Sequence, residues 1–367
     1  MMFEFRARLR ASVLKNHGRD ARATVAVVPL WPCPSRRATD NSSGMSKSSA
    51  AVEKMIAQLG ALRKNPTAPE AKQQIIEALA SKVGYIVERA ATIAGELKLD
   101  VAPQMEAAFN RLLAGDDKSC GGKTAIANSL YELGAETPGA FLAGIKHVQM
   151  EASFGPPVDV AAVLRGICAL GLVRIAHREA MLHITDLLAD PEPQARVLAA
   201  RALAYSGRDD AAFVLRLKIH IGDKDPEVIG ECLTAIMKLA PKTSVDLLAD
   251  QLDHPDELIR ESAALALGES RRREAFEALR NQIEHEPDPE MRRPLVLAIA
   301  VSRLPEAFSY LVTLIESADA ATVVHVLEAL KIYRSDESLR KSVAAAVGKR
   351  NEPAIKRAHH GAFEQKT

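Results

Sequence analysis

The feature that most constrains this chain is a repeat of 31–32 residues in its C-terminal half. Five dipeptides that open an apolar segment follow one another at spacings of 32, 32, 31 and 32 residues: Ala180-Met181, Ala212-Phe213, Ser244-Val245, Ala275-Phe276 and Ala307-Phe308. Leucines continue the same stripe in four of these segments: Leu215, Leu247, Leu279 and Leu311. Apolar residues three or four positions apart indicate one buried face of an α-helix. A period of this length predicts a repeat array rather than one globular core.

The turns that follow these segments carry aspartate and proline: Asp190-Pro191, Asp225-Pro226, Asp253-His254-Pro255 and Asp288-Pro289. Aspartate caps the N-terminus of a helix, and proline fits its first turn because a missing N–H is not needed there. A second helix should therefore follow each turn, and Gly207 and Gly268 are predicted to end two of these second helices. Each unit is then a helical hairpin. One hairpin cannot bury its apolar face alone, so neighbouring hairpins must stack.

These segments resemble the HEAT repeat, and within it the bacterial HEAT-like repeats named for phycobilisome lyases. Residues 253–268 carry the resemblance most clearly, with the sequence Asp-His-Pro-Asp-Glu-Leu-Ile-Arg-Glu-Ser-Ala-Ala-Leu-Ala-Leu-Gly. The resemblance is strong over 178–333 and weakens upstream. It implies an all-α fold, an α-solenoid in which stacked helical hairpins form a HEAT- or armadillo-like superhelix. We expect this solenoid to occupy residues 158–350.

The remaining segments differ from the repeat. Residues 1–44 lack helical periodicity and contain eight basic residues against three acidic ones. This segment is an Arg-rich transit peptide, a signal peptide, or sequence upstream of a true start at Met45. We favour the last interpretation because Met45 opens an ordinary-looking start that leads into a helix. Residues 45–157 are predicted to be helical, as degenerate repeats or a cap, and 351–367 to be a flexible C-terminal tail.

Composition favours a binding protein over an enzyme. Aromatic residues are only 4% of the chain although 47% is hydrophobic, which fits close-packed helices of small residues. The net charge of +1 leaves −4 for the chain after residue 44, which argues against broad capture of nucleic-acid phosphates. The four cysteines are too far apart for a CxxC pair and indicate free thiols in a reducing, cytoplasmic compartment: Cys33, Cys120, Cys168 and Cys232. No apolar run is long enough to span a membrane.

Motifs that carry chemistry are absent from the sequence. Nucleotide-binding, zinc-protease and serine-hydrolase motifs do not occur. HEAT-repeat hydroxylases hold two irons with His-Glu pairs on successive second helices. The one His-Glu pair of this chain, His285-Glu286, lies in a turn before a proline. We therefore predict no catalytic residue, no cofactor and no metal ligand, and we expect that the chain is not an enzyme.

Arg196, Arg260 and Arg292 occupy one slot in the second helices, separated by 64 and 32 residues. Such a ladder can line a binding surface. In HEAT repeats an arginine at this position commonly pairs with the turn aspartate of the neighbouring unit, and the resemblance favours this structural role. The slot of the intervening repeat falls near Ile229 or Gly230, which breaks the ladder.

The function that the resemblance implies is a non-catalytic scaffold or adaptor, which binds a protein partner on the concave face formed by the second helices. The candidate contacts are charged residues of those helices and of one inter-repeat turn: Arg201, Glu231, Lys238, Glu261, Arg271, Arg272, Arg273, Arg292 and Arg293. The arginines at 271–273, with the two at 292 and 293, are expected to form the most basic local patch. A bilin-lyase-like protein is one alternative, and nucleic-acid binding through 271–293 is another. The sequence names neither the partner nor the oligomeric state.

Overall fold

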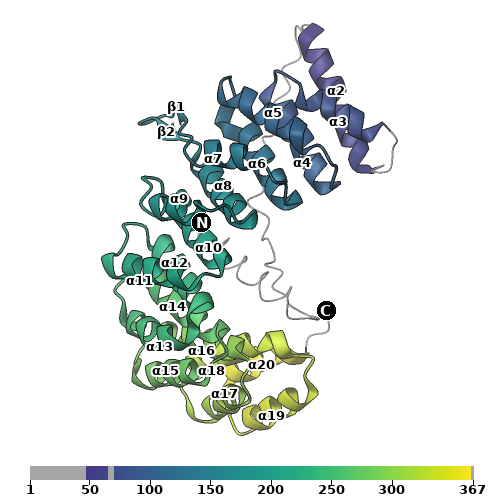
Figure 1. Ribbon diagram of the computed structural model, residues 1–367. Helices are drawn as coiled ribbons and strands as arrows, with labels where there is room; N and C mark the ends of the chain where they lie inside the picture. The colour runs from purple at the N-terminus through teal and green to yellow at the C-terminus, as the bar shows by residue number, and fades with distance from the viewer. Residues whose placement is uncertain (1–46, 65–69, 365–367) are drawn as a thin grey trace. The chain divides into compact units, whose positions relative to one another are not determined.

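The computed structural model of the chain describes residues 47–64 and 70–364, and these residues are mostly helical (Figure 1). Residues 1–44 lie outside the described residues, so the three interpretations of that segment stay predictions. The compact unit that begins at Ala51 holds the whole repeat array. Helix α2 (Lys47–Lys64) precedes the array.

Pairs of antiparallel helices make up the array, and we call the two members of each pair A and B. The A helices are α3 (Ala71–Leu79), α5 (Ala102–Leu113), α7 (Pro138–Gly144), α9 (Ala180–Leu187), α11 (Asp209–Ile221), α13 (Pro241–Ala249), α15 (Arg273–His285), α17 (Pro305–Ser317) and α19 (Glu337–Gly348). The B helices are α4 (Gly84–Glu96), α6 (Gly121–Leu133), α8 (Ala162–Arg174), α10 (Pro193–Ser206), α12 (Pro226–Leu239), α14 (Glu257–Glu269), α16 (Pro289–Ser302), α18 (Ala320–Leu330) and α20 (Pro353–His359).

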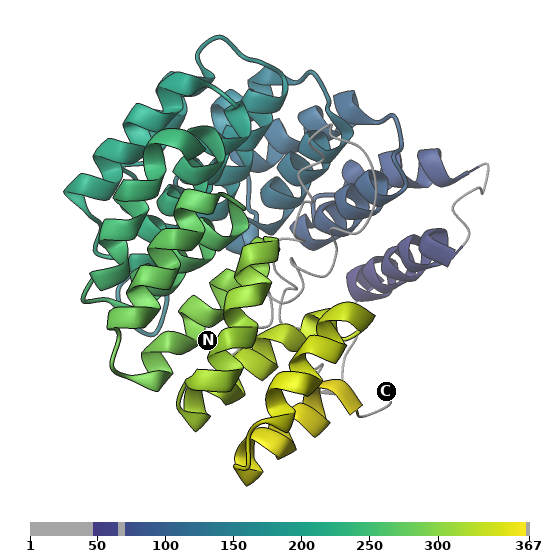
Figure 2. The same cartoon turned by 90° about the horizontal axis from the view of Figure 1, so that it is seen from below.

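Each B helix packs against the A helix of its own hairpin and against the next B helix, without a break from α4 to α20 (Figures 1 and 2). The buried residues of neighbouring helices form one continuous apolar core. A linear stack of hairpins that share one core is an α-solenoid. The predicted all-α solenoid is therefore confirmed. The same packing runs through α4, α6 and α8, where the sequence shows only degenerate repeats.

Close approach between B helices depends on glycine, and it is tightest at two positions. A Cβ atom at Gly268 would lie 2.2 Å from the carbonyl oxygen of Ala298 in α16, and one at Gly166 would lie 2.3 Å from the Cβ of Leu198 in α10. Gly268 therefore does not end α14, as the sequence had suggested, because its role is to let α16 approach. Helix α14 runs one residue further, to Glu269. Gly207, with φ of 63°, ends α10 as predicted.

Aspartate caps several of the B helices, but α10, which follows the predicted Asp190-Pro191 turn, begins after Glu192 without a side-chain cap. Asp225 accepts a hydrogen bond from the backbone N–H of Glu227 at 3.0 Å, and Asp288 accepts one from that of Glu290 at 2.9 Å. In the third such turn the cap is Asp256, not the Asp253 that precedes His254-Pro255. These caps satisfy N–H groups that a helix start leaves without an intrahelical partner.

The C-terminal segment is packed where the sequence predicted a flexible tail. Helix α20 and the short helix η4 (His360–Glu364) continue the array, and α20 packs on α18. Ile355 is fully buried and Ala362 nearly so. The tail prediction is wrong over 351–364 because these apolar side chains complete the last hairpin. Residues 365–367 lie outside the described part.

One connection departs from the short A-to-B turns. Between α7 and α8 the chain inserts a β-hairpin of two short antiparallel strands, β1 (Met150–Glu151) and β2 (Val158–Asp159). The equivalent connection between α11 and α12 consists of residues 222–225. Among the described A-to-B connections, this one alone contains β-strands.

Candidate functional site

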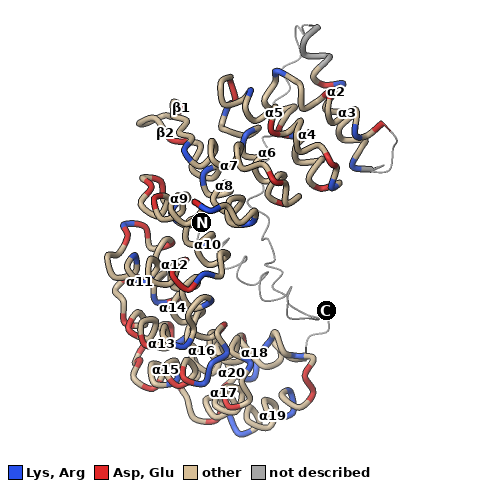
Figure 3. Tube along the Cα trace, in the orientation of Figure 1, with Lys and Arg blue, Asp and Glu red and all other residues tan. Residues whose placement is uncertain are grey.

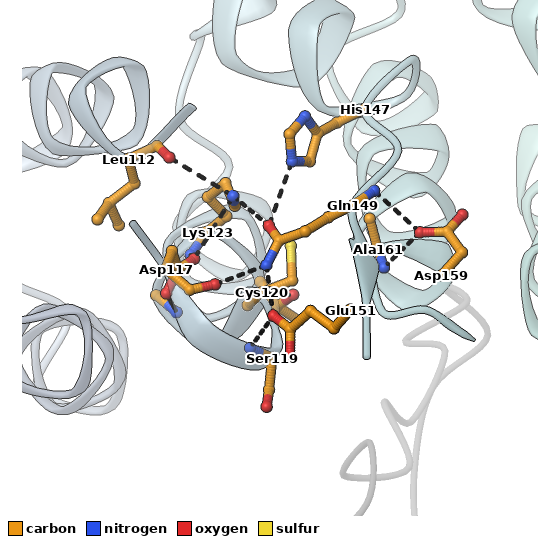
Figure 4. A network of polar contacts seen from close by, with 12 residues as sticks. Leu112, Asp117, Ser119, Cys120, Lys123, His147, Gln149, Glu151, Asp159 and Ala161 are labelled. Carbon is orange, nitrogen blue, oxygen red and sulfur yellow. Dashed lines mark hydrogen bonds and ion pairs between the residues drawn. The ribbon is translucent and has the colours of Figure 1, made fainter. Parts of the chain in front are cut away.

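The base of the inserted hairpin is a buried polar network (Figure 4). Asp117 is 3% exposed and both of its carboxylate oxygens accept backbone N–H groups of α6, from Gly122 and Lys123 at 2.9 Å each. Ser119 and Cys120, just before α6, have left-handed φ angles of 59° and 54°. The carboxylate thus caps α6 and offsets the strain of two non-glycine residues in that conformation.

Lys123 joins this cap to the hairpin. Its side chain is 2% exposed, and its Nζ donates to Gln149 Oε1 at 2.5 Å and lies 3.9 Å from the Asp117 carboxylate. The amide nitrogen of Gln149 in turn donates to the Asp117 carbonyl and to Glu151 Oε1, both at 2.7 Å. The backbone N–H of Ser119 also donates to Glu151 Oε1, at 2.6 Å. The hairpin is therefore fixed to α6 by polar groups that satisfy one another.

A second buried cation, Arg165 of α8, holds the other strand. It donates to Asp159 at 2.7 Å, to both oxygens of Asp190 at 2.7–2.8 Å and to the carbonyl of His147 at 2.9 Å. Burial alone would lower the pKa of Arg165, but the hydrogen bonds from it to Asp190 and Asp159 raise that pKa. Burial would raise the pKa of Asp159, and backbone N–H groups of Ala161 and Gln149, together with Arg165, lower it. Arg165 and Asp159 therefore stay charged near neutral pH.

The network positions the hairpin and offers no activated nucleophile. Burial raises the pKa of the Cys120 thiol to about 11, so the thiolate is scarce at neutral pH. Within 47–64 and 70–364, no group of three His, Cys, Asp or Glu side chains could hold a metal ion. The connection that contains the hairpin exposes four apolar side chains, and Phe154 is fully exposed: Val148, Met150, Phe154 and Val158. The polar contacts at its base hold the inserted hairpin in a fixed position.

The predicted contacts on the B helices lie on neighbouring helices, and both charge signs are present (Figure 3). Arg201 of α10 pairs with Glu231 of α12 at 2.8 Å. Arg293 of α16 pairs with Glu328 of α18 at 3.5 Å. Most of these side chains are exposed, although Glu231 is largely covered. We call the exposed and half-exposed charged residues of the B helices α10, α12, α14, α16 and α18 the B-layer row. Its predicted members are Arg201, Glu231, Lys238, Glu261 and Arg293.

Lys238 and Arg271 belong to a further part of this surface, beside Glu269 at the end of α14. Burial raises the pKa of Glu269, and the positive charges of Lys238 and Arg271 offset part of that rise. Lys238 and Arg271 are both exposed. The structure thus brings together two residues that the sequence had assigned to different segments.

The predicted basic patch divides into two groups. The arginines at 271–273 lie at the start of α15, whereas those at 292 and 293 lie near the start of the antiparallel helix α16. One helix of 13 residues separates them, a length of about 20 Å. Several of these side chains already have carboxylate partners: Arg272 pairs with Glu274, and Arg292 with Asp319. The hairpin geometry therefore does not form one concentrated phosphate-binding surface from these five arginines.

The arginine ladder has the structural role that the resemblance implied. Arg196 binds Asp223 of the next A-to-B turn at 2.6 Å, and Arg292 binds Asp319 at 2.9 Å. Arg196 also donates to carbonyl oxygens of its own turn, at Asp190 and Pro191. Burial would raise the pKa of Asp223, but hydrogen bonds from Arg196 and Lys218 lower it to about 2. Each such arginine links two successive turns.

The arginine ladder differs from the prediction in two ways. Arg260 donates to the carbonyls of His254 and Pro255 and, in the described residues, has no carboxylate within ion-pair distance. Arg165 is an additional member that the sequence reasoning missed, since the repeat pattern is faint before residue 178. The available signal was spacing: Arg165 precedes Asp190 by 25 residues, and Arg196 precedes Asp223 by 27.

None of the helices in the described ranges is both long and apolar enough to cross a membrane. The sequence matches the family of HEAT repeats over residues 181–268 and 214–300. No curated protein matches it at a significant level.

The solved structures that are similar to this chain include the following two. One is the complex of CpcE and CpcF of phycocyanin lyase from Nostoc sp. PCC7120, with 15% identity over 78% of this chain and 94% of that chain, and a TM-score of 0.35. The other is an engineered protein, with 18% identity over 88% of this chain and 96% of that chain, and a TM-score of 0.39. The match over 181–300, together with the stacked A and B helices, shows that this part of the chain consists of HEAT-like repeats.

Proposed function

We propose that the chain is a non-catalytic scaffold that binds a protein partner along the B-layer row, from α10 to α18. The observation that supports this most is the exposure of charged side chains of both signs on consecutive B helices. Arg201, Lys238 and Arg293 are exposed, and two of them make ion pairs between neighbouring repeats. The row therefore offers a surface that is continuous across several hairpins.

The ion pairs of the row do not prevent binding. Arg201 is 42% exposed and Arg293 is 44% exposed at the side chain. Exposed pairs of this kind contribute only about 0–1 kcal/mol to stability. A bound partner can therefore exchange one member of a pair for a residue of its own with little loss.

The charge pattern defines the chemistry of the partner. Because the row contains both acidic and basic side chains, a complementary surface must also carry both signs. A protein segment with acidic and basic residues meets this requirement, whereas a nucleic-acid backbone is uniformly anionic. Binding should weaken with salt, since exposed charges are screened.

The test compares two triple variants with the same change in charge. The B-layer variant carries Arg201→Glu, Lys238→Glu and Arg293→Glu, and the control carries Lys242→Glu, Arg340→Glu and Lys341→Glu on the A helices α13 and α19. A photo-crosslinker at Leu297, which is exposed on α16, identifies the partner by mass spectrometry. The purified partner is then titrated against each protein by calorimetry, after melting curves show that both variants are folded.

We expect the B-layer variant to bind the partner at least about tenfold more weakly, while the control stays within about twofold of wild type. Equal losses in both variants, or unchanged binding by the B-layer variant, would refute the proposal. Duplex DNA retained at low salt by the wild type alone would favour the nucleic-acid alternative. Covalent colour on an acceptor protein, after co-expression with a bilin, would favour the lyase alternative.

A further inference from the structure

Helix α11 exposes an apolar stripe on the outer face of the A layer. Phe213, Leu217 and Ile221 follow one another at intervals of four residues and are 75%, 60% and 72% exposed. The opposite face of the helix is buried through Ala211, Leu215 and Ile219. The buried Ala180 of the preceding A helix, α9, corresponds to the buried Ala211. Leu182 therefore corresponds to Phe213, and it is 61% exposed.

The repeat itself does not require apolar residues at these positions. In α15 and α17 the buried residues again recur at intervals of four, and the outward positions are polar. They are occupied by Glu277, Asn281, His285, Ser309, Thr313 and Ser317. The outward apolar side chains of α11 (Phe213, Leu217 and Ile221) therefore have no role in the core. Together with Leu182 they expose on the order of 500 Å², more than half of the ~800 Å² that each partner contributes to a standard interface.

We propose that a second copy of this chain covers the stripe, with the two α11 helices antiparallel around a two-fold axis at Leu217. The charges at the ends of the stripe support this choice of occupant. Asp209 and Asp210 lie at its N-terminal end, where Asp210 pairs with Arg208 at 2.6 Å, and His220 and Lys224 lie at its C-terminal end. Asp209 leaves the N-terminal end with a net negative charge, and an antiparallel pair places this end of one copy near Lys224 of the other, at both ends of the contact. A parallel pair would place like charges together.

The middle of the stripe is free of interfering charge. Arg216 points to the next A helix, where its Nη1 donates to the Thr243 carbonyl at 3.4 Å. Lys218 pairs with Asp223 at 2.7 Å. Leu217 can therefore meet Leu217 of the second copy, while Phe213 of each copy faces Ile221 of the other. Such a contact is self-complementary, as a two-fold dimer requires.

The first experiment measures the mass of the full chain in solution by light scattering and sedimentation equilibrium, from about 1 to 100 micromolar. We expect a dimer, and Leu217→Asp should raise its dissociation constant at least about a hundredfold because the change occurs twice at the centre. Phe154→Asp is the matched control, since Phe154 is fully exposed on the inserted hairpin. It should leave the dimer unchanged. Melting curves establish that both variants fold.

The second experiment tests the antiparallel register by cysteine crosslinking, in a background that carries Cys33→Ser. Leu217→Cys should crosslink to itself. Phe213→Cys and Ile221→Cys should crosslink efficiently only when the two proteins are mixed. A chain that stays monomeric throughout, a dimer that tolerates Leu217→Asp, or equal crosslinking by Phe213→Cys alone would overturn the proposal. The B-layer variant should still dimerise, so this inference and the proposed function fail separately.

Discussion

Two regions of the array reach the same packing through different sequences. From α10 to α18 the hairpins follow a 31–32-residue pattern, with short turns that carry aspartate and an arginine that links successive turns. From α4 to α8 this pattern is faint, yet the B helices pack against one another without interruption. There the long connection with the inserted hairpin replaces a short turn, and a buried lysine and arginine satisfy its polar groups.

The comparison separates what the fold requires from what the repeat pattern supplies. Both regions need small residues where B helices meet, as Gly166 and Gly268 show. Both also need a partner for every polar group buried at a turn. The repeated Asp-Pro turn with its arginine is one solution, and the network around Asp117 and Lys123 is another. Sequence periodicity therefore reports the first solution only.

The largest expected effect is at the irregular turn. Asp117→Ala removes the cap from two N–H groups of α6 and leaves the buried Lys123 without its anionic neighbour. We expect the free energy of unfolding to fall by about 3–5 kcal/mol. Denaturant unfolding followed by circular dichroism, with hydrogen exchange of α6, measures this change. Asp116→Ala, at the exposed neighbouring residue, should change stability by less than about 0.5 kcal/mol. A loss below about 1 kcal/mol in Asp117→Ala would contradict the role assigned to the network.

The next effect tests the shared requirement for close B-helix packing. Gly268→Ala places a Cβ against the backbone carbonyl of Ala298, which cannot move without shifting α16. We expect a loss of about 2 kcal/mol, measured by denaturant unfolding. The control Gly348→Ala meets open space near the end of α19 and should be neutral or stabilising by up to about 1 kcal/mol. If both changes are neutral, helix proximity does not limit this position.

The last effect concerns the regular turns. It is similar in size to that of Gly268→Ala at neutral pH and becomes smaller as the pH falls. The pKa of Asp223 is lowered from 3.8 to about 2, so the folded state favours its charged form. Its contribution is complete above about pH 4 and is lost as the pH falls through the folded-state value of about 2. Asp223→Asn should therefore lose about 2 kcal/mol at pH 7 relative to wild type, and this difference should shrink towards pH 2.

Arg260→Met serves as the contrast, because Arg260 bonds to backbone carbonyls rather than to a carboxylate. Its loss should be about 1 kcal/mol and should stay constant between about pH 7 and pH 3, because the carbonyl oxygens that it binds do not titrate. Unfolding curves at several pH values measure both variants. A constant loss in Asp223→Asn would show that its ion pairs do not contribute to stability.

The sequence by itself determined the repeated part of the fold. Spacing of apolar residues, aspartate turns and the arginine slot depend on residues close to one another or separated by one repeat, so they can be read along the chain. The helical hairpins, the Gly207 helix end and the structural role of Arg196 followed from these patterns. The B-layer candidates were found in the same way, as charged residues on the exposed side of the second helices.

Only the tertiary structure decided the rest, because it depends on distances that no pattern encodes. The sequence pattern predicts that Gly268 ends a helix. In the structure, a Cβ atom at this position would lie 2.2 Å from a backbone carbonyl oxygen of α16. The five arginines of the expected patch fall into two groups because antiparallel helices place their starts at opposite ends of a hairpin. Asp117, Lys123 and Gln149 belong to different segments and have no common spacing, and folding joins them into one buried network. The apolar residues of α11 fit a helical pattern, and only burial shows that three of them face outward.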